Sequence, residues 1–341
     1  MNKCEIFMPG RLCLLGEHSD WASEYKAFNS SIREGAAIVL GLNRGLYFEA
    51  VKSDKYKYKC NHLNLDIEWI HHKASVDSKE HSSNYVLKSF EVMKKYYDVG
   101  GASIECVKVD LPIKKGLASS ASICMAVVRV FNHLYDLELD IHQEMSLAYE
   151  AERNAGSMCG KLDQICGYGN RLLALTFRDH GLHVQPIENK TKLRILLVDL
   201  DGYKDTSKIL YDLNQPYVNF DIEEHYGIYQ ALGDTNQMIV ESAKVAIHQG
   251  DLKKLGEIMY QAQEVFDLNI AKYSLVNLKA PKMHDLLEDE ELKGFIYGAK
   301  GVGSHGDGSM QLLLKETTDE DEIISYIYDK YGYESFVISI E

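Results

Sequence analysis

Apolar and polar residues follow two different periods along this chain, and each period predicts a different kind of element. Segments that alternate between apolar and polar, and short apolar runs bounded by glycine or polar residues, predict β-strands. Asn43-Arg44-Gly45 is expected to form the turn between two of these strands, and residues 178–181 the turn of a hairpin. Strands are predicted over residues 5–15, 36–42, 46–51, 102–109, 172–177, 182–187, 193–199 and 335–340, with a strand–loop–strand over 295–314.

Apolar residues that recur every three or four positions predict helices over other segments. In residues 83–97, for example, Val86, Leu87, Phe90 and Met93 fall on one face, and Ser83 is placed to cap the helix. Helices are predicted over residues 83–97, from within a stretch of small residues at 116–122 to about residue 135, and over 141–154, 222–248 and 252–268.

Strands and helices are mixed in both halves of the chain, without a regular β-α-β alternation. This mixture favours an α+β fold over a doubly wound parallel sheet. A chain of 341 residues is longer than one typical hydrophobic core, so two domains are expected. The texture changes to long acidic helices beyond the strand that ends at residue 199, and we place the boundary near residue 190, with domains 1–190 and 191–341.

The net charge of the chain is −14. So acidic a protein is a poor candidate for binding nucleic acid or an anionic membrane surface. A small anionic ligand remains open, because backbone N–H groups and a metal ion can bind it locally. We therefore expect small-molecule partners, with no nucleic acid and no membrane.

Seven cysteines are present, an odd number without any C-x-x-C spacing. This pattern favours reduced, buried cysteines in a cytosolic protein. No signal peptide and no apolar run of membrane-spanning length is visible, so we expect a soluble cytoplasmic protein, either a monomer or a homodimer. The cysteines are Cys4, Cys13, Cys60, Cys106, Cys124, Cys159 and Cys166.

A stretch of small and hydroxylated residues lies at the start of the helix that is predicted to run to about residue 135. Glycine lets a backbone approach an anion closely, and the free N–H groups of a helix start suit a phosphate. The stretch lacks the lysine of a Walker A loop. A serine-capped core helix after a tight turn is an equally good interpretation of the stretch alone. Its residues are Gly116, Leu117, Ala118, Ser119, Ser120, Ala121 and Ser122.

Near the N-terminus, Gly16 ends an apolar segment and charged residues follow at once. Glu17, His18 and Asp20 offer two carboxylates and an imidazole beside the indole of Trp21. Carboxylates accept hydrogen bonds from hydroxyl groups, and an aromatic ring stacks on the apolar face of a sugar. The group therefore indicates a polyol site, although a solvated surface turn has the same composition.

A third segment, Gly301-Val302-Gly303-Ser304-His305-Gly306, fits the pattern G-x-G-x-x-G. That pattern marks a dinucleotide site only where it opens a helix in a β-α-β unit. Here the strand-like run Met310 to Leu314 follows it, so the dinucleotide interpretation is rejected. We expect a glycine-rich hairpin whose backbone packs close to a ligand or another loop.

In this order, the three segments together resemble the three motifs of the GHMP kinases, a family named for galactokinase, homoserine kinase, mevalonate kinase and phosphomevalonate kinase. The resemblance spans nearly the whole chain. The segment from Pro112 to Ser122 is similar to the family's phosphate-loop signature, and Gly10 to Trp21 is most similar to the galactokinase branch. The run Met158 to Gln164 resembles the catalytic segment of the same branch.

The resemblance implies a two-domain GHMP kinase fold, with an N-terminal domain like ribosomal protein S5 and a ferredoxin-like C-terminal domain. It implies ATP and Mg²⁺ as cofactors and a monosaccharide as substrate, phosphorylated at its anomeric hydroxyl. Asp163 would be the catalytic acid/base, paired with Arg11, which keeps it ionised.

The same resemblance assigns the binding residues. Residues 116–122, with Gly303 from the third segment, would hold ATP. Ser120 and Glu152 would bind the metal, with Glu150 as the alternative to Glu152. Glu17, His18 and Asp20, together with Asp163, would bind the sugar.

The sequence also departs from the galactokinase pattern. Residues 22–29 replace the family's asparagine and glycines, and Ser304, His305 and Asp307 stand where the third motif is mostly glycine. Three functions therefore stay open: a sugar-1-kinase for galactose, a related hexose, a uronic acid or a pentose; a kinase for a homoserine- or mevalonate-like alcohol; and a non-catalytic sugar and ATP sensor. The acids of the first segment favour the first function over the second, and an intact Asp163 argues against the third.

Overall fold

The computed structural model of the chain describes residues 2–70, 73–76, 82–113, 115–178 and 181–340. The chain divides into two compact units, and neither is a continuous piece of sequence. The expected boundary near residue 190 lies inside unit 2, and the assignment of 1–190 and 191–341 to two family domains stays a prediction. Unit 1 comprises Met1–Arg11, Gly41–Ile113 and Ala118–Asn170, and unit 2 comprises Leu12–Leu40, Lys114–Leu117 and Arg171–Glu341.

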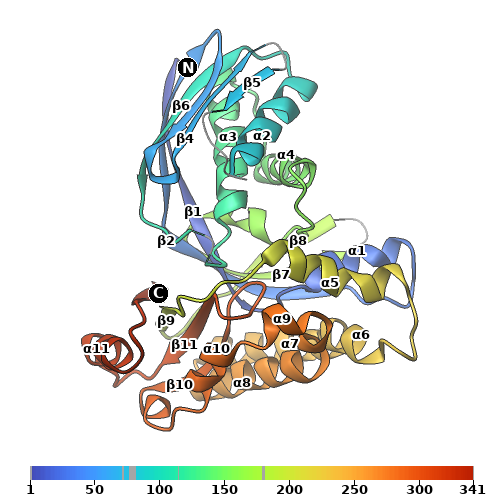
Figure 1. Cartoon of the computed structure of the whole chain (residues 1–341), viewed down its shortest axis with the longest axis vertical. Helices are drawn as coiled ribbons and strands as arrows, with labels where there is room; N and C mark the ends of the chain where they lie inside the picture. The colour runs from blue at the N-terminus through green and yellow to red at the C-terminus, as the bar shows by residue number, and fades with distance from the viewer. Residues whose placement is uncertain (1, 71–72, 77–81, 114, 179–180, 341) are drawn as a thin grey trace. The chain divides into compact units, whose positions relative to one another are not determined.

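Unit 1 is a sheet with helices α2, α3 and α4 packed together on one of its faces (Figure 1). Its strands are neighbours in the order β5, β4, β3, β6 and β2, and all of these pairs are antiparallel except β3 with β6. Helix α3 is buried along most of its length, and it packs against both α2 and α4. The elements are β3 Tyr56–Cys60, β4 Leu65–Ile70, β5 Lys73–Val76, α2 Ser82–Tyr96, β6 Gly101–Val109, α3 Ser119–Tyr135, α4 Ile141–Asn154 and the 3₁₀ helices Asn61–Leu63 and Asp163–Tyr168.

Unit 2 contains an antiparallel sheet in the order β10, β11, β9 and β12. Helix α8 packs on β10, α7 packs on α8, and α11 packs on β12. The helices are α1 Ser19–Glu24, α5 Thr206–Val218, α6 Tyr226–Leu232, α7 Asp234–Gln249, α8 Leu252–Asn269, α9 Leu275–Leu278, α10 Pro281–Leu287, α11 Glu320–Tyr331 and the 3₁₀ helices Tyr25–Ala27, Ala271–Ser274 and Leu292–Gly294. The strands are β7 Leu172–Arg178, β8 Gly181–Pro186, β9 Leu193–Asp199, β10 Ile296–Gly301, β11 Ser309–Leu314 and β12 Ser335–Ile340.

Two long strands, β1 Lys3–Leu15 and β2 Gly35–Ser53, each run from one unit into the other, and they pair with one another. Residues 35–40 of β2 pair with β7 in unit 2, and residues 46–53 pair with β6 in unit 1. At residues 11–12 and 40–41 the chain therefore passes from one unit to the other within a strand.

Most predicted elements are confirmed, and the helix over 141–154 and the strands over 193–199 and 335–340 have the predicted bounds. The predicted turn at residues 43–45 is wrong, because β2 continues through it. Gly45 is needed there for close packing: a Cβ on it would lie 2.2 Å from the carbonyl oxygen of Met8 in β1. The hairpin of β7 and β8 is confirmed, while residues 179–180 of its turn lie outside the described residues.

The single long helix predicted over 222–248 is also wrong. The chain forms α6 and α7 instead, interrupted at Gly233, whose φ of −105° and ψ of −110° are not helical. Periodicity did not indicate β3, β4, β5 or α5. All seven cysteines are free and buried, as expected. Among the described residues, no helix combines the length and the apolar character needed to cross a membrane.

Candidate active site

Arg11 and Asp163, the two predicted catalytic residues, form an ion pair within unit 1. The Arg11 guanidinium donates from Nη2 to Oδ1 of Asp163. The Arg11 side chain is only 6% exposed, whereas that of Asp163 is 23% exposed. The buried guanidinium of Arg11 therefore holds the carboxylate of Asp163 in a fixed direction through a charge-assisted bond. The carboxylate itself stays accessible to a small molecule.

Ser120 and Glu152, the predicted metal ligands, also lie together in unit 1. Ser120 Oγ donates to Glu152 Oε1 at 2.7 Å, and Gln164 Nε2 donates to Glu152 Oε2 at 2.8 Å. The side-chain oxygen of Gln164 is buried and has no hydrogen-bond partner among the described residues. Hydroxyl, carboxylate and amide oxygens are the ligands that Mg²⁺ prefers, so these residues fit such an ion.

Glu150 has a different environment from Glu152, although only one residue separates them. Its carboxylate accepts hydrogen bonds from Lys95 Nζ at 2.8 Å and from Tyr96 Oη at 2.9 Å. Glu150 is thus occupied by partners on α2, while Glu152 is 1% exposed and directed at Ser120. The geometry favours Glu152 over Glu150 as a metal ligand.

Burial, followed by the nearby charge of Asp163, raises the pKa of Glu152 to about 7. A cation bound beside Glu152 would stabilise the ionised form of this carboxyl group. Burial, followed by the charges of Glu152 and other neighbours including Asp163, also raises the pKa of Tyr85 on α2. Tyr85 was not singled out from the sequence, because it follows only the helical pattern of α2.

The start of α3 has the form expected of an anion site. Ala118 precedes the helix with a φ of 61°, and no side chain caps this helix start in the described part of the chain. The residue before the helix is an alanine, which has no capping group, so the serine-capped alternative is wrong, and a helix start of this form suits an anion. Ser122 has a structural position: its buried hydroxyl lies 2.9 Å from the carbonyl oxygens of Pro9 and Ala118.

In unit 2, the first residues of the phosphate loop contact the third motif. Gly116 has a φ of 78° and Gly303 a φ of 60°, values that glycine adopts without strain. A Cβ on Gly303 would lie 3.1 Å from Gly116 Cα, so the two backbones touch where side chains are absent. The predicted hairpin is confirmed: β10 and β11 are antiparallel partners, with this loop between them.

Glu17 does not lie in a solvated turn. Its carboxylate pairs with Nζ of Lys300 on β10, and the two side chains are 7% and 1% exposed. Lys300 Nζ also donates to the carbonyl oxygen of Gly301 at 2.9 Å. A lone charge in an apolar strand is the one weak signal in the sequence that could have indicated this lysine.

His18 and Asp20 are also buried in unit 2, at 5% and 7% exposure. Burial, together with the positive charges of Lys204 and Lys300, lowers the pKa of His18 to about 3, so this imidazole is neutral. Its Nδ1 accepts a hydrogen bond from Trp21 Nε1 at 3.1 Å. Trp21 is 3% exposed, so its indole belongs to the core and is not an open stacking surface.

His305 has a defined position rather than that of an ordinary loop residue. It adopts a φ of 63°, is 2% exposed and stacks on Phe266 of α8, with ring centroids 3.7 Å apart. His18 lies on the same aromatic group, with its ring centroid 6.0 Å from that of Phe266. The first and third motifs are thus joined by an aromatic stack as well as by an ion pair.

Among the described residues, no group of three or more histidine, cysteine, aspartate or glutamate side chains is arranged to hold a metal ion. A cation beside Glu152 would therefore also use hydroxyl and amide oxygens, together with oxygens from a bound ligand.

Comparison with known proteins gives a consistent result. Residues 84–170 match the family described as GHMP kinases N terminal domain. A galactokinase from Thermosipho africanus is 21% identical over 93% of this chain and 90% of its own length. A galactokinase from Pyrococcus furiosus is 29% identical over 48% of this chain and 43% of its own length.

Solved structures share the fold. The structure of Lactococcus lactis galactokinase complexed with galactose matches with a TM-score of 0.75 at 19% identity, covering 99% of this chain and 93% of that one. Methanococcus jannaschii mevalonate kinase matches with a TM-score of 0.69 at 17% identity, covering 99% and 98%. The predicted α+β fold of the two-domain GHMP kinase type is confirmed.

Proposed function

We propose that this chain, a galactokinase-like member of the GHMP kinases and hence an ATP-dependent phosphotransferase with an alcohol acceptor, phosphorylates the anomeric hydroxyl of a monosaccharide. The observation that carries the proposal is the pair of Arg11 and Asp163, in which a buried guanidinium holds an accessible carboxylate. The relatives named galactokinase support a sugar as acceptor. Galactose, a related hexose, a uronic acid and a pentose remain the candidate substrates.

On the acceptor side, Asp163 accepts the proton of the attacking hydroxyl or orients that hydroxyl toward the phosphoryl group. Arg11 holds the carboxylate in a fixed direction through its charge-assisted hydrogen bond. Phosphoryl transfer needs little covalent chemistry from the protein, since positioning and neutralisation of charge lower most of the barrier. One acid held by one arginine is sufficient for this part of the reaction.

On the ATP side, the N–H groups at the start of α3 and the glycine backbone at Gly116 and Gly303 bind phosphate oxygens. Ser120 and Glu152, with the side-chain oxygen of Gln164, would hold Mg²⁺. When bound, Mg²⁺ neutralises negative charge on the phosphates.

For the sugar, Glu17 and Asp20 accept hydrogen bonds from hydroxyl groups, and Lys300 holds Glu17 in place. His18 contributes as a neutral imidazole. Its Nδ1 is already bonded to Trp21 Nε1, so the Nε2 side of the ring faces the substrate. Trp21 supports His18 from the core.

The test is turnover of Mg-ATP with a panel of free sugars, sugar acids, homoserine and mevalonate, followed by release of ADP. We expect turnover with one or a few monosaccharides in the wild type and its loss in Asp163→Asn. Glu150→Gln serves as the matched control, because Glu150 is a carboxylate nearby in sequence that accepts hydrogen bonds from Lys95 and Tyr96 on α2.

Each outcome separates the candidate functions. Turnover only with homoserine or mevalonate would keep the kinase and exclude the sugar acceptor. ATP binding without turnover on the whole panel would favour the non-catalytic sensor. Equal activity in Asp163→Asn and the wild type would contradict the role of Asp163.

A further inference from the structure

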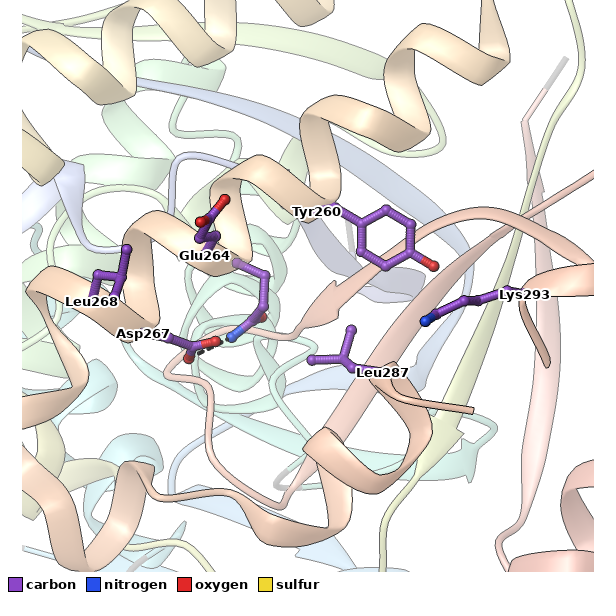
Figure 2. A pocket seen from close by; sticks show the side chains of 7 residues that line it. Tyr260, Glu264, Asp267, Leu268, Leu287 and Lys293 are labelled. Carbon is purple, nitrogen blue, oxygen red and sulfur yellow. Dashed lines mark hydrogen bonds between the residues drawn. The ribbon is translucent and has the colours of Figure 1, made fainter. Parts of the chain in front are cut away.

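Unit 2 contains a pocket that the proposed reaction does not use. It has a volume of about 470 Å³ and opens along one face of α8 (Figure 2). This volume is within the range of small-molecule sites. The α8 residues lie three or four positions apart, which places them on a single helix face. The pocket is lined by Tyr260, Gln263, Glu264, Asp267 and Leu268 from α8, by Leu287 from α10 and by Lys293.

The charge of the lining is unbalanced. Lys293 is neutralised by Glu290, whose Oε1 accepts its hydrogen bond at 2.6 Å. Asp267 is approached by Nε2 of His284 only at 3.8 Å, and Glu264 has no hydrogen bond or ion pair within the described residues. Glu264 and Asp267, on adjacent helical turns, thus line the pocket, and no lysine or arginine among the described residues pairs with either of them.

A buried residue, Gln263, fixes the position of the Asp267 carboxylate. Gln263 is 3% exposed, accepts from the backbone N–H of Gly301 at 2.8 Å and donates to Asp267 Oδ1 at 2.9 Å, the dashed bond in Figure 2. Burial raises the pKa of Asp267 above its ordinary value, which is the effect of a carboxylate that has lost water and lacks a full cation partner.

The rest of the lining is apolar and aromatic. The ring of Tyr260 stands at the end of the pocket beside Lys293, with Leu287 between it and Asp267 (Figure 2). Leu268 is 68% exposed at the other end, next to the carboxylates. A ligand that satisfies this surface has a positive head and an apolar body.

We propose that this pocket binds a small organic ammonium ion. Its N–H groups donate to Asp267 and Glu264, and its apolar body lies on Tyr260, Leu268 and Leu287. The site is separate from the residues assigned to the kinase reaction, and the inference does not depend on the proposed function.

The probe is 2-phenylethylamine, with 2-phenylethanol as its uncharged analogue, titrated onto the full chain and followed by saturation-transfer NMR. The titration is made at 0.15 M salt, where non-specific attraction to an acidic protein is screened. For a ligand of this size we expect a Kd on the order of 1 mM for the amine, and at least about tenfold weaker binding of the alcohol.

The variants locate the site. Glu264→Gln and Asp267→Asn are each expected to weaken the amine about tenfold, because each removes one charge-assisted hydrogen bond. Glu257→Gln is the matched control: Glu257 is an exposed carboxylate of α8 outside the pocket, paired with Lys254 at 3.0 Å. It should leave the Kd unchanged.

Equal binding of the amine and the alcohol, or equal weakening by Glu257→Gln and Glu264→Gln, would overturn the proposal. So would absence of amine binding to the wild type at 10 times the expected Kd (about 10 mM). Glu264 is exposed, so its variant keeps the test decisive even where Asp267→Asn disturbs folding.

Discussion

Replacing Lys300 by methionine tests whether the buried pair with Glu17 holds the first and third motifs together. Methionine keeps the length and the apolar stem of lysine and removes only the charge. Glu17 then remains 7% exposed with no positive partner in its ion pair. Removing one partner of a buried pair typically destabilises a protein by about 3–5 kcal/mol, because the other charge stays buried.

The double variant Glu17→Gln with Lys300→Met removes both charges and should recover most of this loss. Lys254→Met is the control, since Lys254 pairs with Glu257 on the surface, with the two side chains 57% and 53% exposed. A surface pair of this kind contributes about 1 kcal/mol or less.

The assay is urea unfolding followed by tryptophan fluorescence. The chain has two tryptophans, Trp21 in unit 2 and Trp69 in unit 1, so a Trp69→Phe background reports on unit 2 alone. With a denaturant dependence of about 3 kcal/mol per molar, Lys300→Met should lower the unfolding midpoint by about 1 M or more. The Michaelis constant for the sugar should rise and that for ATP should stay constant. A midpoint shift no larger than that of Lys254→Met would refute the reasoning.

Three further predictions concern the ATP and acceptor residues. Asp163→Asn should lower kcat by at least about 100-fold while ATP binding, measured by calorimetry, is retained. Burial raises the pKa of Glu152 to about 7, above the unfolded value, so the folded state keeps a proton that the unfolded state has lost. The stability of the nucleotide-free protein should therefore fall as the pH rises from about 4.5 to about 7. Thermal unfolding should show that this pH dependence is lost in Glu152→Gln and retained in Glu150→Gln. Gly116→Ala should raise the Michaelis constant for ATP, because Gly116 has a φ of 78° and the new Cβ would lie 3.0 Å from a side chain of the third motif; an unchanged constant would contradict the role of this loop.

The candidate site was partly predictable from sequence because its motifs are local. The phosphate loop and the cluster around Glu17 each lie within a few consecutive residues, and residue type alone indicates their chemistry. The part played by Lys300 was not predictable in this way. Lys300 follows an ordinary strand pattern, and its importance comes from Glu17, a partner that the local pattern does not identify.

The sequence alone determined where most helices and strands lie, since periodicity reflects which side of an element meets the core. It was misleading where a backbone contact decided the local structure, as at Gly45, where β1 approaches too closely for any side chain. The pair of Arg11 with Asp163, 152 residues away, was expected only because the chain resembles a known family, and the pair of Lys300 with Glu17, 283 residues away, was seen only in the tertiary structure. Such pairs depend on how strands from distant segments become neighbours, and burial then gives their charges an effect that the same residues would lack at the surface.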